Sequence, residues 1–203
     1  AHLARVRFMG QDPRRKKVLI LAGSGGNGGG ALAAARRLAN YGAEVSAVTT
    51  RPSDKIRGVP AQQLEILTLM NIPIFQVGAI ETISGDFDLI VDGIIGYSLK
   101  GAPRGGAAEL IRWANEYGSP ILALDIPSGV HGSTGLVHDP AIQATATMTL
   151  ALPKTGLMQE SAAHNVGELY LADISVPPAL YRAPGLDLEA APLFANSDII
   201  RLR

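Results

Sequence analysis

The stretch Ile121-Leu-Ala-Leu-Asp125-Ile-Pro-Ser-Gly129 decides the fold class of this chain. Four consecutive apolar residues bounded by turn-forming residues predict a buried strand of a parallel sheet. This strand delivers the carboxylate of Asp125 at its carboxyl end, where open α/β sheets bind ligands. Pro127 fixes its own φ angle and biases Ile126 away from helix, so the chain turns sharply there. Asp125 is therefore either a carboxylate of a binding site or a strand-end residue that caps the next turn.

The rest of the chain alternates between strand and helix patterns. Strands expected at 17–21 and 43–50 enclose a glycine-rich turn and an Ala- and Arg-rich helix over 31–41, which together have the size of a βαβ unit. The alternation predicts a doubly wound α/β sheet. The remaining predicted elements are helices over 60–71 and 107–117 and strands over 73–77, 88–96, 144–152 and 167–174.

Length and composition favour one domain over residues 1–203. The chain is 47% apolar but only 5% aromatic, which predicts a sizeable core of aliphatic side chains and alanine. We expect a basic arm at 1–16 and a surface-wrapping tail over 178–203. A solvated arm and an arm that contacts phosphate or RNA are both compatible with the basic residues. These are Arg5, Arg7, Arg14, Arg15, Lys16 and Lys17.

Several classes of function are disfavoured by composition. The absence of cysteine excludes disulfides, thiolate metal sites and a cysteine nucleophile. A formal net charge of zero gives no overall field toward nucleic acid or an anionic membrane. Apolar runs are strand-length and no signal peptide is visible, so we expect a cytoplasmic protein. The four histidines lack ligand spacing and no G-x-S-x-G motif occurs, so a hydrolase triad is not predicted.

The segment Gly23-Ser-Gly-Gly-Asn-Gly28 fits the pattern G-x-G-x-x-G between a strand and a helix. Glycines let backbone N–H groups approach a pyrophosphate, and the helix N-terminus supplies partial positive charge. The alternative is simply a tight turn. A dinucleotide fold usually places an acidic residue after its second strand, where this chain has Thr49, Thr50 and Arg51. Arg51 either accommodates a 2′-phosphate or is a solvated loop residue.

Two nucleotide-dependent activities are not predicted. No lysine follows the glycines at P-loop spacing, which disfavours an NTPase. Tyr97 and Lys100 have the wrong spacing for the Tyr/Lys pair of a short-chain dehydrogenase. Ordinary hydride transfer is therefore not our interpretation.

Three segments, in order, resemble the YjeF N-terminal domain family, the NAD(P)H-hydrate epimerases. They are Gly23-Ser-Gly-Gly-Asn-Gly-Gly-Gly30, Val91-Asp-Gly-Ile-Ile-Gly96 and Asp125-Ile-Pro-Ser-Gly129. The resemblance implies a three-layer αβα sandwich with a Rossmann-like, doubly wound and mostly parallel sheet, and a homodimer. It extends from about Val18 to about Pro177. Its later landmarks are Lys154, Gly156-Leu157, Gly167-Glu-Leu-Tyr170 and Asp173-Ile-Ser-Val-Pro177.

The function implied by this resemblance is the interconversion of the R and S forms of hydrated NAD(P)H at C6. An NAD(P)HX dehydratase, as functional partner, then restores NAD(P)H, and no redox cofactor is bound because NAD(P)HX is the substrate. Asp125 is the implied catalytic acid/base. Asn27, Asp92 and Ser128 are the implied ligands of a potassium ion, and their hard oxygen donors suit such a cation better than zinc. The implied substrate-binding residues are Gly25, Gly26, Asn27, Gly28, Gly29, Gly30, Gly96, Tyr97, Ser98, Leu99, Lys100, Gly101, Ala102 and Asp125.

The glycine loop departs from the family pattern G-P-G-N-N-G-G-D-G. Gly26 replaces the first Asn and Gly30 replaces the Asp, which removes a carboxylate from the loop. After Gly96 the family often has Thr-Gly, where this chain has Tyr97 and Ser98. An epimerase is the predicted function. The alternatives are a non-catalytic nucleotide-binding module and a dimerisation or scaffold module of the same fold.

For three residues, the local sequence alone is compatible with either a functional or a purely structural role. Asp92 is either an ion ligand or a strand-end carboxylate that accepts backbone N–H bonds. Asn27 is either an ion ligand or a turn residue that tolerates a left-handed φ. Lys154 is either a surface lysine at a strand end or a residue that reaches a phosphate.

Overall fold

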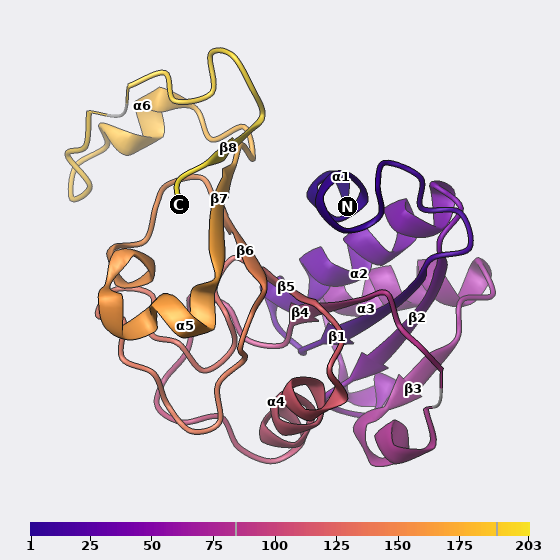
Figure 1. The fold of residues 1–203 in the computed structure, drawn as a ribbon. Helices are drawn as coiled ribbons and strands as arrows, with labels where there is room; N and C mark the ends of the chain where they lie inside the picture. The colour runs from indigo at the N-terminus through magenta and orange to yellow at the C-terminus, as the bar shows by residue number, and fades with distance from the viewer. Residues whose placement is uncertain (84, 190) are drawn as a thin grey trace.

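The computed structural model describes residues 1–83, 85–189 and 191–203. Within these ranges the chain forms an eight-stranded sheet in the order β3-β2-β1-β4-β5-β6-β7-β8 (Figure 1). Neighbouring strands are parallel, except that β7 and β8 are antiparallel. The order grows outward from β1 in both directions, which confirms the predicted doubly wound, mostly parallel α/β fold. The strands are β1 (Lys17–Ala22), β2 (Glu44–Thr49), β3 (Ile74–Gln76), β4 (Leu89–Gly93), β5 (Ile121–Leu124), β6 (Ala146–Leu150), β7 (Glu168–Ala172) and β8 (Ile199–Arg201).

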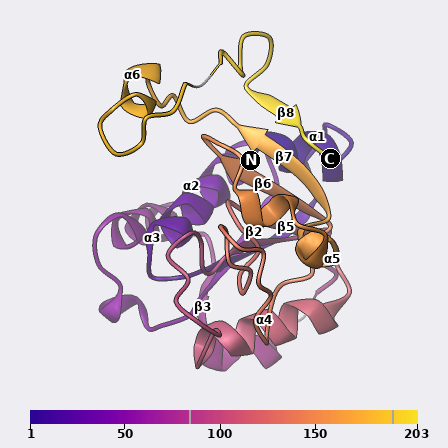
Figure 2. The same cartoon turned by 90° about the vertical axis from the view of Figure 1, so that its left-hand side faces the viewer.

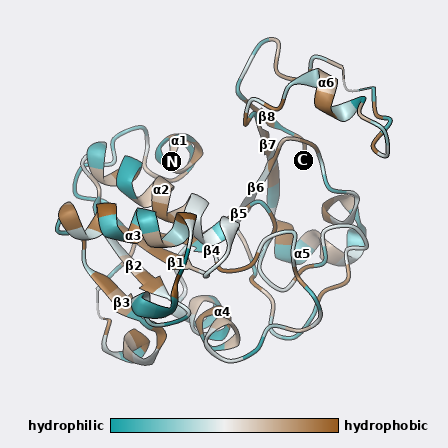
Figure 3. Cartoon of the chain, turned by 180° about the vertical axis from the view of Figure 1, so that it is seen from behind, coloured by the Kyte–Doolittle hydropathy of each residue, from teal (hydrophilic) through white to brown (hydrophobic). Residues whose placement is uncertain are grey.

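Successive residues of β1 pack into cores on opposite faces of the sheet. Val18 and Ile20 belong to one core cluster, Leu19 and Leu21 to the other, and all four are fully buried. Burial on both faces explains why the strand is a continuous apolar run rather than an alternating one. The apolar residues follow the central strands in the hydropathy colouring of Figure 3.

Helices cover both faces and complete three layers (Figures 1 and 2). The first core cluster takes residues from α1 (His2–Phe8), α2 (Gly26–Asn40) and α3 (Val59–Leu69). The second takes residues from α4 (Gly106–Tyr117) and the 3-10 helix Val77–Thr82. No helix in the described part of the chain is long and apolar enough to cross a membrane. The shorter helical segments are Ser53–Lys55, Thr155–Met158, Glu160–Ala162, α5 (Ala163–Val166) and α6 (Pro178–Tyr181).

The predicted strand over 88–96 is too long. β4 ends at Gly93, and the backbone N–H of Ile94 donates to the Asp92 carboxylate (3.0 Å) instead of continuing a ladder. A side chain that competes for a backbone donor in this way ends regular structure. The apolar run continued past the strand because Ile94 is buried in the loop that follows.

Within the basic arm expected at residues 1–16, residues 2–9 are not solvated but packed on the sheet. Residues 2–8 form α1, and the side chains of Leu3, Ala4 and Met9 are buried in the first core cluster. Apolar burial stabilises by about 25 cal/mol per Å², and this gain fixes the helix on the sheet. The basic residues Arg5 and Arg7 of α1 hid the signal, because the inward-facing apolar positions are few and lie among them.

The tail predicted over 178–203 also differs from the expectation that it wraps the surface. β8 pairs antiparallel with β7, with Ile199 opposite Ala172, and so extends the sheet. The segment that carries α6 projects from this edge in Figures 1 and 3. Residue 190 of the predicted tail lies outside the described residues. A three-residue strand offers too few positions for a detectable alternation, so the sequence did not reveal it.

Candidate active site

A cavity of about 820 Å³ opens along the carboxyl edge of the sheet. Its lining includes segments that follow the neighbouring strands β2, β1, β4 and β5, and the last residue of β6. Because these strands are parallel, their carboxyl ends meet at one edge, which is where open α/β sheets bind ligands. In the order of the strands, the segments are residues 50–51, 23–27, 94–98, 125 and 150.

The glycine loop forms the part of the wall that follows β1. A Cβ at Gly23 would lie 1.9 Å from the carbonyl oxygen of Ile94, and one at Gly28 would lie 1.9 Å from that of Gly23. Only glycine permits these two approaches, which bring β1, α2 and the exit of β4 together. This packing also starts α2 at Gly26, before the predicted alanine-rich stretch, although glycine is a poor helix former.

The N-terminus of α2 faces the cavity. Its N-cap Gly25 and its first residue Gly26 both line the wall. The first N–H groups of a helix lack partners within the helix and carry partial positive charge. The loop can therefore receive a phosphate group without a lysine or arginine.

Asp125 lines the cavity in a strained backbone conformation. Its φ angle is +66°, in the left-handed region that non-glycine residues seldom adopt. Such a conformation costs about 1–3 kcal/mol and is found preferentially at functional sites. The backbone N–H of Asp125 donates to the carbonyl oxygen of Met148 (2.8 Å). This bond to β6 helps hold the strained turn in place.

Lys154 pairs with the carboxylate of Asp125. Its Nζ donates to Asp125 Oδ1 at 2.6 Å and to the carbonyl oxygen of Leu150 at 2.7 Å. The side chains of Lys154 and Asp125 are only 16% and 13% exposed, so solvent screens this ion pair weakly. Sequence reasoning left the role of Lys154 open. The available signal was its position just after the strand beside that of Asp125, since neighbouring parallel strands end side by side.

Asp92 and Ser128 form a buried pair beneath the cavity. The Ser128 hydroxyl donates to Asp92 Oδ1 (2.6 Å) and the Ser128 backbone N–H donates to Oδ2 (2.8 Å). Burial raises the pKa of Asp92 to about 6, although these hydrogen bonds and the one from the Ile94 N–H act in the opposite direction. The hydroxyl of Ser128 also accepts from the N–H of Ile95 (2.8 Å). The pair therefore fastens the exit of β4 to the exit of β5.

The three predicted potassium ligands lie at different depths. Asn27 lines the cavity and its Nδ2 donates to the carbonyl oxygen of Leu124 (3.0 Å). Asp92 and Ser128 are fully buried and do not belong to the cavity lining. Over the ranges that the structure describes, no three His, Cys, Asp or Glu residues gather as they would around a transition metal.

The predicted substrate-binding residues divide into two sets. Gly28 and Gly29 are buried within α2, and residues 99–102 lie outside the cavity lining. Arg104, which the sequence analysis did not single out, lines the cavity together with the start of α4. The predicted residues that do line the cavity are Gly25, Gly26, Asn27, Gly30, Gly96, Tyr97, Ser98 and Asp125.

A second recess of about 440 Å³ adjoins the cavity beside Asp125 and is mostly apolar. It shares Tyr97, Asp125 and Leu150 with the cavity and adds Ile174 and Tyr181. The last two residues come from the segment after β7. Ile174 lies in a landmark of the family resemblance that carried no predicted role, and Tyr181 lies in the tail, where no sequence signal pointed to the site.

The doubly wound sheet, with a glycine loop and a strand-end carboxylate at one edge, defines a Rossmann-like α/β protein. The chain matches the family described as YjeF-related protein N-terminus over residues 1–156. It belongs to this family, as its sequence motifs predicted.

Named relatives agree with the family match. The chain is 42% identical over 161 residues to an NAD(P)H-hydrate epimerase of Dehalogenimonas lykanthroporepellens, covering 79% of this chain and 63% of that protein. It is 37% identical over 158 residues to an NAD(P)H-hydrate epimerase of Truepera radiovictrix, covering 78% of this chain and 69% of that protein. A bifunctional NAD(P)H-hydrate repair enzyme Nnr of Moorella thermoacetica is 41% identical over 153 residues, covering 72% of this chain and 29% of the enzyme. The chain thus spans less than two thirds of two of these three relatives.

The fold is shared with a solved structure. The crystal structure of yeast ynu0 superposes with a TM-score of 0.76 at 22% identity, covering 95% of this chain and 79% of that one. This likeness supports the three-layer architecture.

Proposed function

We propose that this chain is an NAD(P)H-hydrate epimerase, which interconverts the R and S forms of hydrated NAD(P)H. The observation that carries the proposal is the strained Asp125, held by Lys154 at a cavity that the glycine loop also lines. A dinucleotide needs such a loop for its pyrophosphate, and epimerisation needs a group that carries a proton near the ring. The names of the relatives point to the same reaction.

The reaction inverts C6 of the hydrated ring, which bears both the ring nitrogen and a hydroxyl group, without a change in oxidation state. Opening of the C6–N bond releases the hydroxyl proton, whereas departure of the hydroxyl group requires a proton. In either route the broken bond re-forms on the opposite face and the proton returns. We assign this proton transfer to the Asp125 carboxylate, and a well-placed group of this kind contributes about 10²–10⁴-fold in rate.

Lys154 holds one oxygen of the carboxylate and leaves the other for the substrate. Its Nζ donates to Asp125 Oδ1, while Oδ2 lies beside Gly96, 3.3 Å from where a Cβ of that residue would be. Absence of a side chain at Gly96 keeps this oxygen accessible. The glycine loop binds the phosphates and so fixes the ring relative to Asp125, which lowers the entropic cost of reaction.

A potassium ion fits the donor chemistry of Asn27, Asp92 and Ser128. The carboxylate of Asp92 is fully buried, and the described residues place no cationic side chain in contact with it. A buried carboxylate without a counter-charge is costly, and an alkali cation would offset that cost and reinforce the junction of β4 and β5. We expect the melting temperature to be higher in potassium chloride than in choline chloride. An Asp92→Asn variant should lose this difference, and an equal melting temperature of the wild type in both salts would contradict the ion site.

Partners and location are also part of the proposal. The bifunctional repair enzymes among the relatives support an NAD(P)HX dehydratase as functional partner. We further propose a homodimer and a cytoplasmic location, both on the resemblance to the family. Light scattering on the purified chain measures the first, and a monomeric mass would contradict it.

A proton NMR time course on mixed R and S NADPH hydrate tests the activity. A dehydratase specific for the S form removes that epimer, so an active epimerase speeds the loss of the R form. We expect acceleration that is proportional to the concentration of this protein. No acceleration at high protein concentration would contradict the proposal.

The second candidate is a non-catalytic nucleotide-binding or scaffold module. Gly26 and Gly30, which stand where the family pattern has Asn and Asp, favour this alternative. In that case saturation-transfer signals from the dinucleotide would identify a nucleotide-binding module. Their absence would indicate a scaffold.

A further inference from the structure

Two arginines line the cavity on the side of β2, away from Asp125. Arg51 lies two residues after the end of β2, and Arg104 precedes Gly105, the N-cap of α4. The start of α4 lies against this end of the sheet, because a Cβ at Gly106 would be 2.6 Å from the carbonyl oxygen of Thr50. Both arginines therefore belong to the same end of the cavity.

The sheet sets the distance between this end and the reacting end. Arg51 follows β2 and Asp125 follows β5, and the order β2-β1-β4-β5 places three inter-strand steps between them. At about 4.8 Å per step this is about 14 Å. The glycine loop follows β1 and lies between the two ends.

The β2 end has an unbalanced positive charge. Over the described ranges, the ion pairs of the structure involve neither Arg51 nor Arg104. The single carboxylate of the cavity lining, Asp125, lies at the opposite end and is paired with Lys154. A phosphate group is the ligand that two unpaired guanidinium groups recognise best, because each can donate two parallel hydrogen bonds.

We propose that Arg51 and Arg104 bind the 2′-phosphate of the adenosine ribose, so that NADPH hydrate is preferred over NADH hydrate. This inference rests on the proposed function, which makes a dinucleotide the ligand. A dinucleotide carries its nicotinamide ring, its pyrophosphate and its adenosine ribose in that order. Asp125, the glycine loop and Arg51 follow one another in the same order across the sheet.

The residues after β2 support the same choice. In dinucleotide-binding folds an acidic side chain in this region binds the free 2′-hydroxyl of NAD, whereas an arginine accommodates the 2′-phosphate of NADP. In this chain β2 ends at Thr49, and Thr50 and Arg51 follow it. The hydroxyl of Thr49 donates to the carbonyl oxygen of Arg51 (2.7 Å), which fixes the backbone from which the guanidinium group extends.

Titration calorimetry with NADP⁺ and NAD⁺ tests the inference, because the two probes differ only in the 2′-phosphate. We expect NADP⁺ to bind at least about tenfold more tightly than NAD⁺ at low salt, with a smaller ratio at high salt. Arg51→Ala should weaken NADP⁺ binding about tenfold and leave NAD⁺ binding within about twofold. Arg104→Ala should act in the same direction.

Lys55→Ala is the matched control, since it removes one exposed positive charge from the same segment but Lys55 does not line the cavity. It should leave the ratio of the two affinities unchanged. Equal affinities of the wild type for the two probes would overturn the inference, as would an equal loss of both in Arg51→Ala.

The activity and binding measurements together distinguish failure of the 2′-phosphate site from failure of the proposed epimerase function. Accelerated loss of R-NADPH hydrate together with equal binding of NADP⁺ and NAD⁺ would overturn the 2′-phosphate site and leave the epimerase intact. A preference for NADP⁺ that depends on Arg51, without any epimerase activity, would support the site and contradict the enzyme.

Discussion

Two ion pairs in this molecule use similar chemistry in different settings. Asp125 and Lys154 meet at 2.6 Å beside the cavity, with side chains 13% and 16% exposed. Glu168 and Arg7 meet at 2.8 Å at the side of the sheet, with side chains 23% and 41% exposed. The first pair sits on a strained backbone and leaves one carboxylate oxygen beside Gly96 in the cavity wall, whereas the second lies on regular helix and strand.

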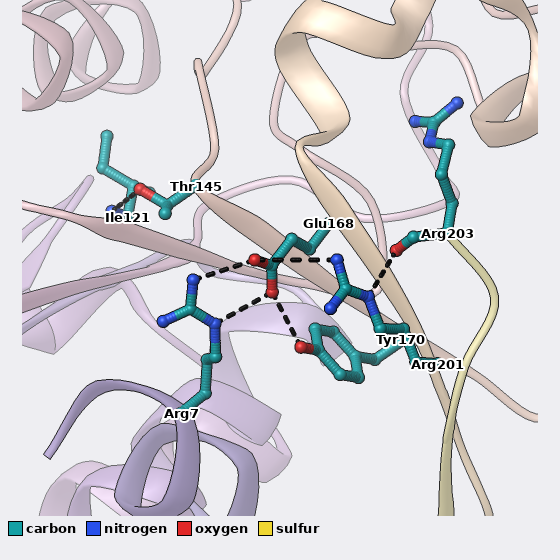
Figure 4. A network of polar contacts seen from close by, with 7 residues as sticks. All are labelled: Arg7, Ile121, Thr145, Glu168, Tyr170, Arg201 and Arg203. Carbon is teal, nitrogen blue, oxygen red and sulfur yellow. Dashed lines mark hydrogen bonds and ion pairs between the residues drawn. The ribbon is translucent and has the colours of Figure 1, made fainter. Parts of the chain in front are cut away.

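The Glu168 network uses both oxygens of its carboxylate (Figure 4). Arg7 donates from Nε and Nη2 to the two oxygens (2.9 and 2.8 Å), and the hydroxyl of Tyr170 donates to Oε2 (2.7 Å). Arg201 on β8 lies 3.8 Å from Oε1. The network joins α1 near the N-terminus to β7 and β8 near the C-terminus.

This difference in how the carboxylate oxygens are used distinguishes an ion pair that stabilises the fold, Glu168–Arg7, from one that is placed to react, Asp125–Lys154. A carboxylate whose oxygens are all occupied within the protein contributes to stability. A carboxylate held by one oxygen on a strained turn is available for a substrate. This distinction predicts which substitutions change turnover and which change the free energy of unfolding.

The largest expected effect is on turnover. Asp125→Asn should lower the rate of loss of R-NADPH hydrate by about 10²–10⁴-fold, because the amide cannot carry the proton. Asparagine tolerates a left-handed φ, so the fold should persist. Glu168→Gln is the matched control and should retain full turnover. Unchanged turnover in the Asp125→Asn variant would contradict the assignment of the proton transfer to Asp125, whatever the melting temperature of the variant.

A smaller loss is expected from Lys154→Met, which keeps the length of the side chain but removes its charge. We expect kcat to fall by about 10–100-fold, since the orientation of Asp125 is lost while the carboxylate remains. KM should change by less than about threefold, because the phosphates bind elsewhere. The reverse split, with KM raised and kcat unchanged, would indicate that Lys154 binds the substrate rather than positioning Asp125.

The position of this site could be predicted from sequence, but its contacts could not. A strand pattern places Asp125, the glycine loop and residue 51 at one edge of a parallel sheet, because side-by-side strands end together. The pairing of Asp125 with Lys154 depends on the register of β5 with β6, which no local pattern encodes. Arg104 and Tyr181 reach the cavity region from a loop and from the tail, whose paths depend on tertiary packing.

For the fold as well, contacts between distant parts of the chain could not be predicted from sequence, and the Glu168 network is an example. The alternation of strands and helices along the chain is what predicts a parallel, doubly wound sheet. The docking of α1 depends on contacts between residues 7 and 168, far apart in the chain. A run of basic residues gave no indication that one of them has a partner across the molecule.

A third prediction concerns acid stability. The Arg7 guanidinium and the Tyr170 hydroxyl lower the pKa of Glu168 to about 2 in the folded protein. A lowered pKa stabilises the fold above the ordinary pKa of the group, near 4.5, and this contribution is lost as the pH falls toward 2. Because the pair is partly exposed, we expect Glu168→Gln to cost about 1 kcal/mol at pH 7 and much less near pH 2.

Urea unfolding at a series of pH values measures this difference between the wild type and Glu168→Gln. Asp12→Asn is the control, because its partner Arg14 lies two residues away in the chain and the pair joins no separate elements. It should be nearly neutral for unfolding at pH 7. A cost of Glu168→Gln that is the same at pH 7 and pH 2 would show that the carboxylate charge does not stabilise the docking of α1.

The smallest expected effect comes from Tyr170→Phe, which removes one hydroxyl from the Glu168 network. The lost hydrogen bond should cost about 0.5–1.5 kcal/mol of unfolding free energy and leave turnover unchanged. In a Glu168→Ala background the same substitution should cost less than half as much, because the acceptor is already gone. Tyr181→Phe, in the recess beside Asp125, is the matched control and should leave the melting temperature unchanged. Full additivity of the Tyr170 and Glu168 substitutions would show that the hydroxyl acts independently of the carboxylate. The link between α1 and β7 would then consist of the Arg7–Glu168 pair alone.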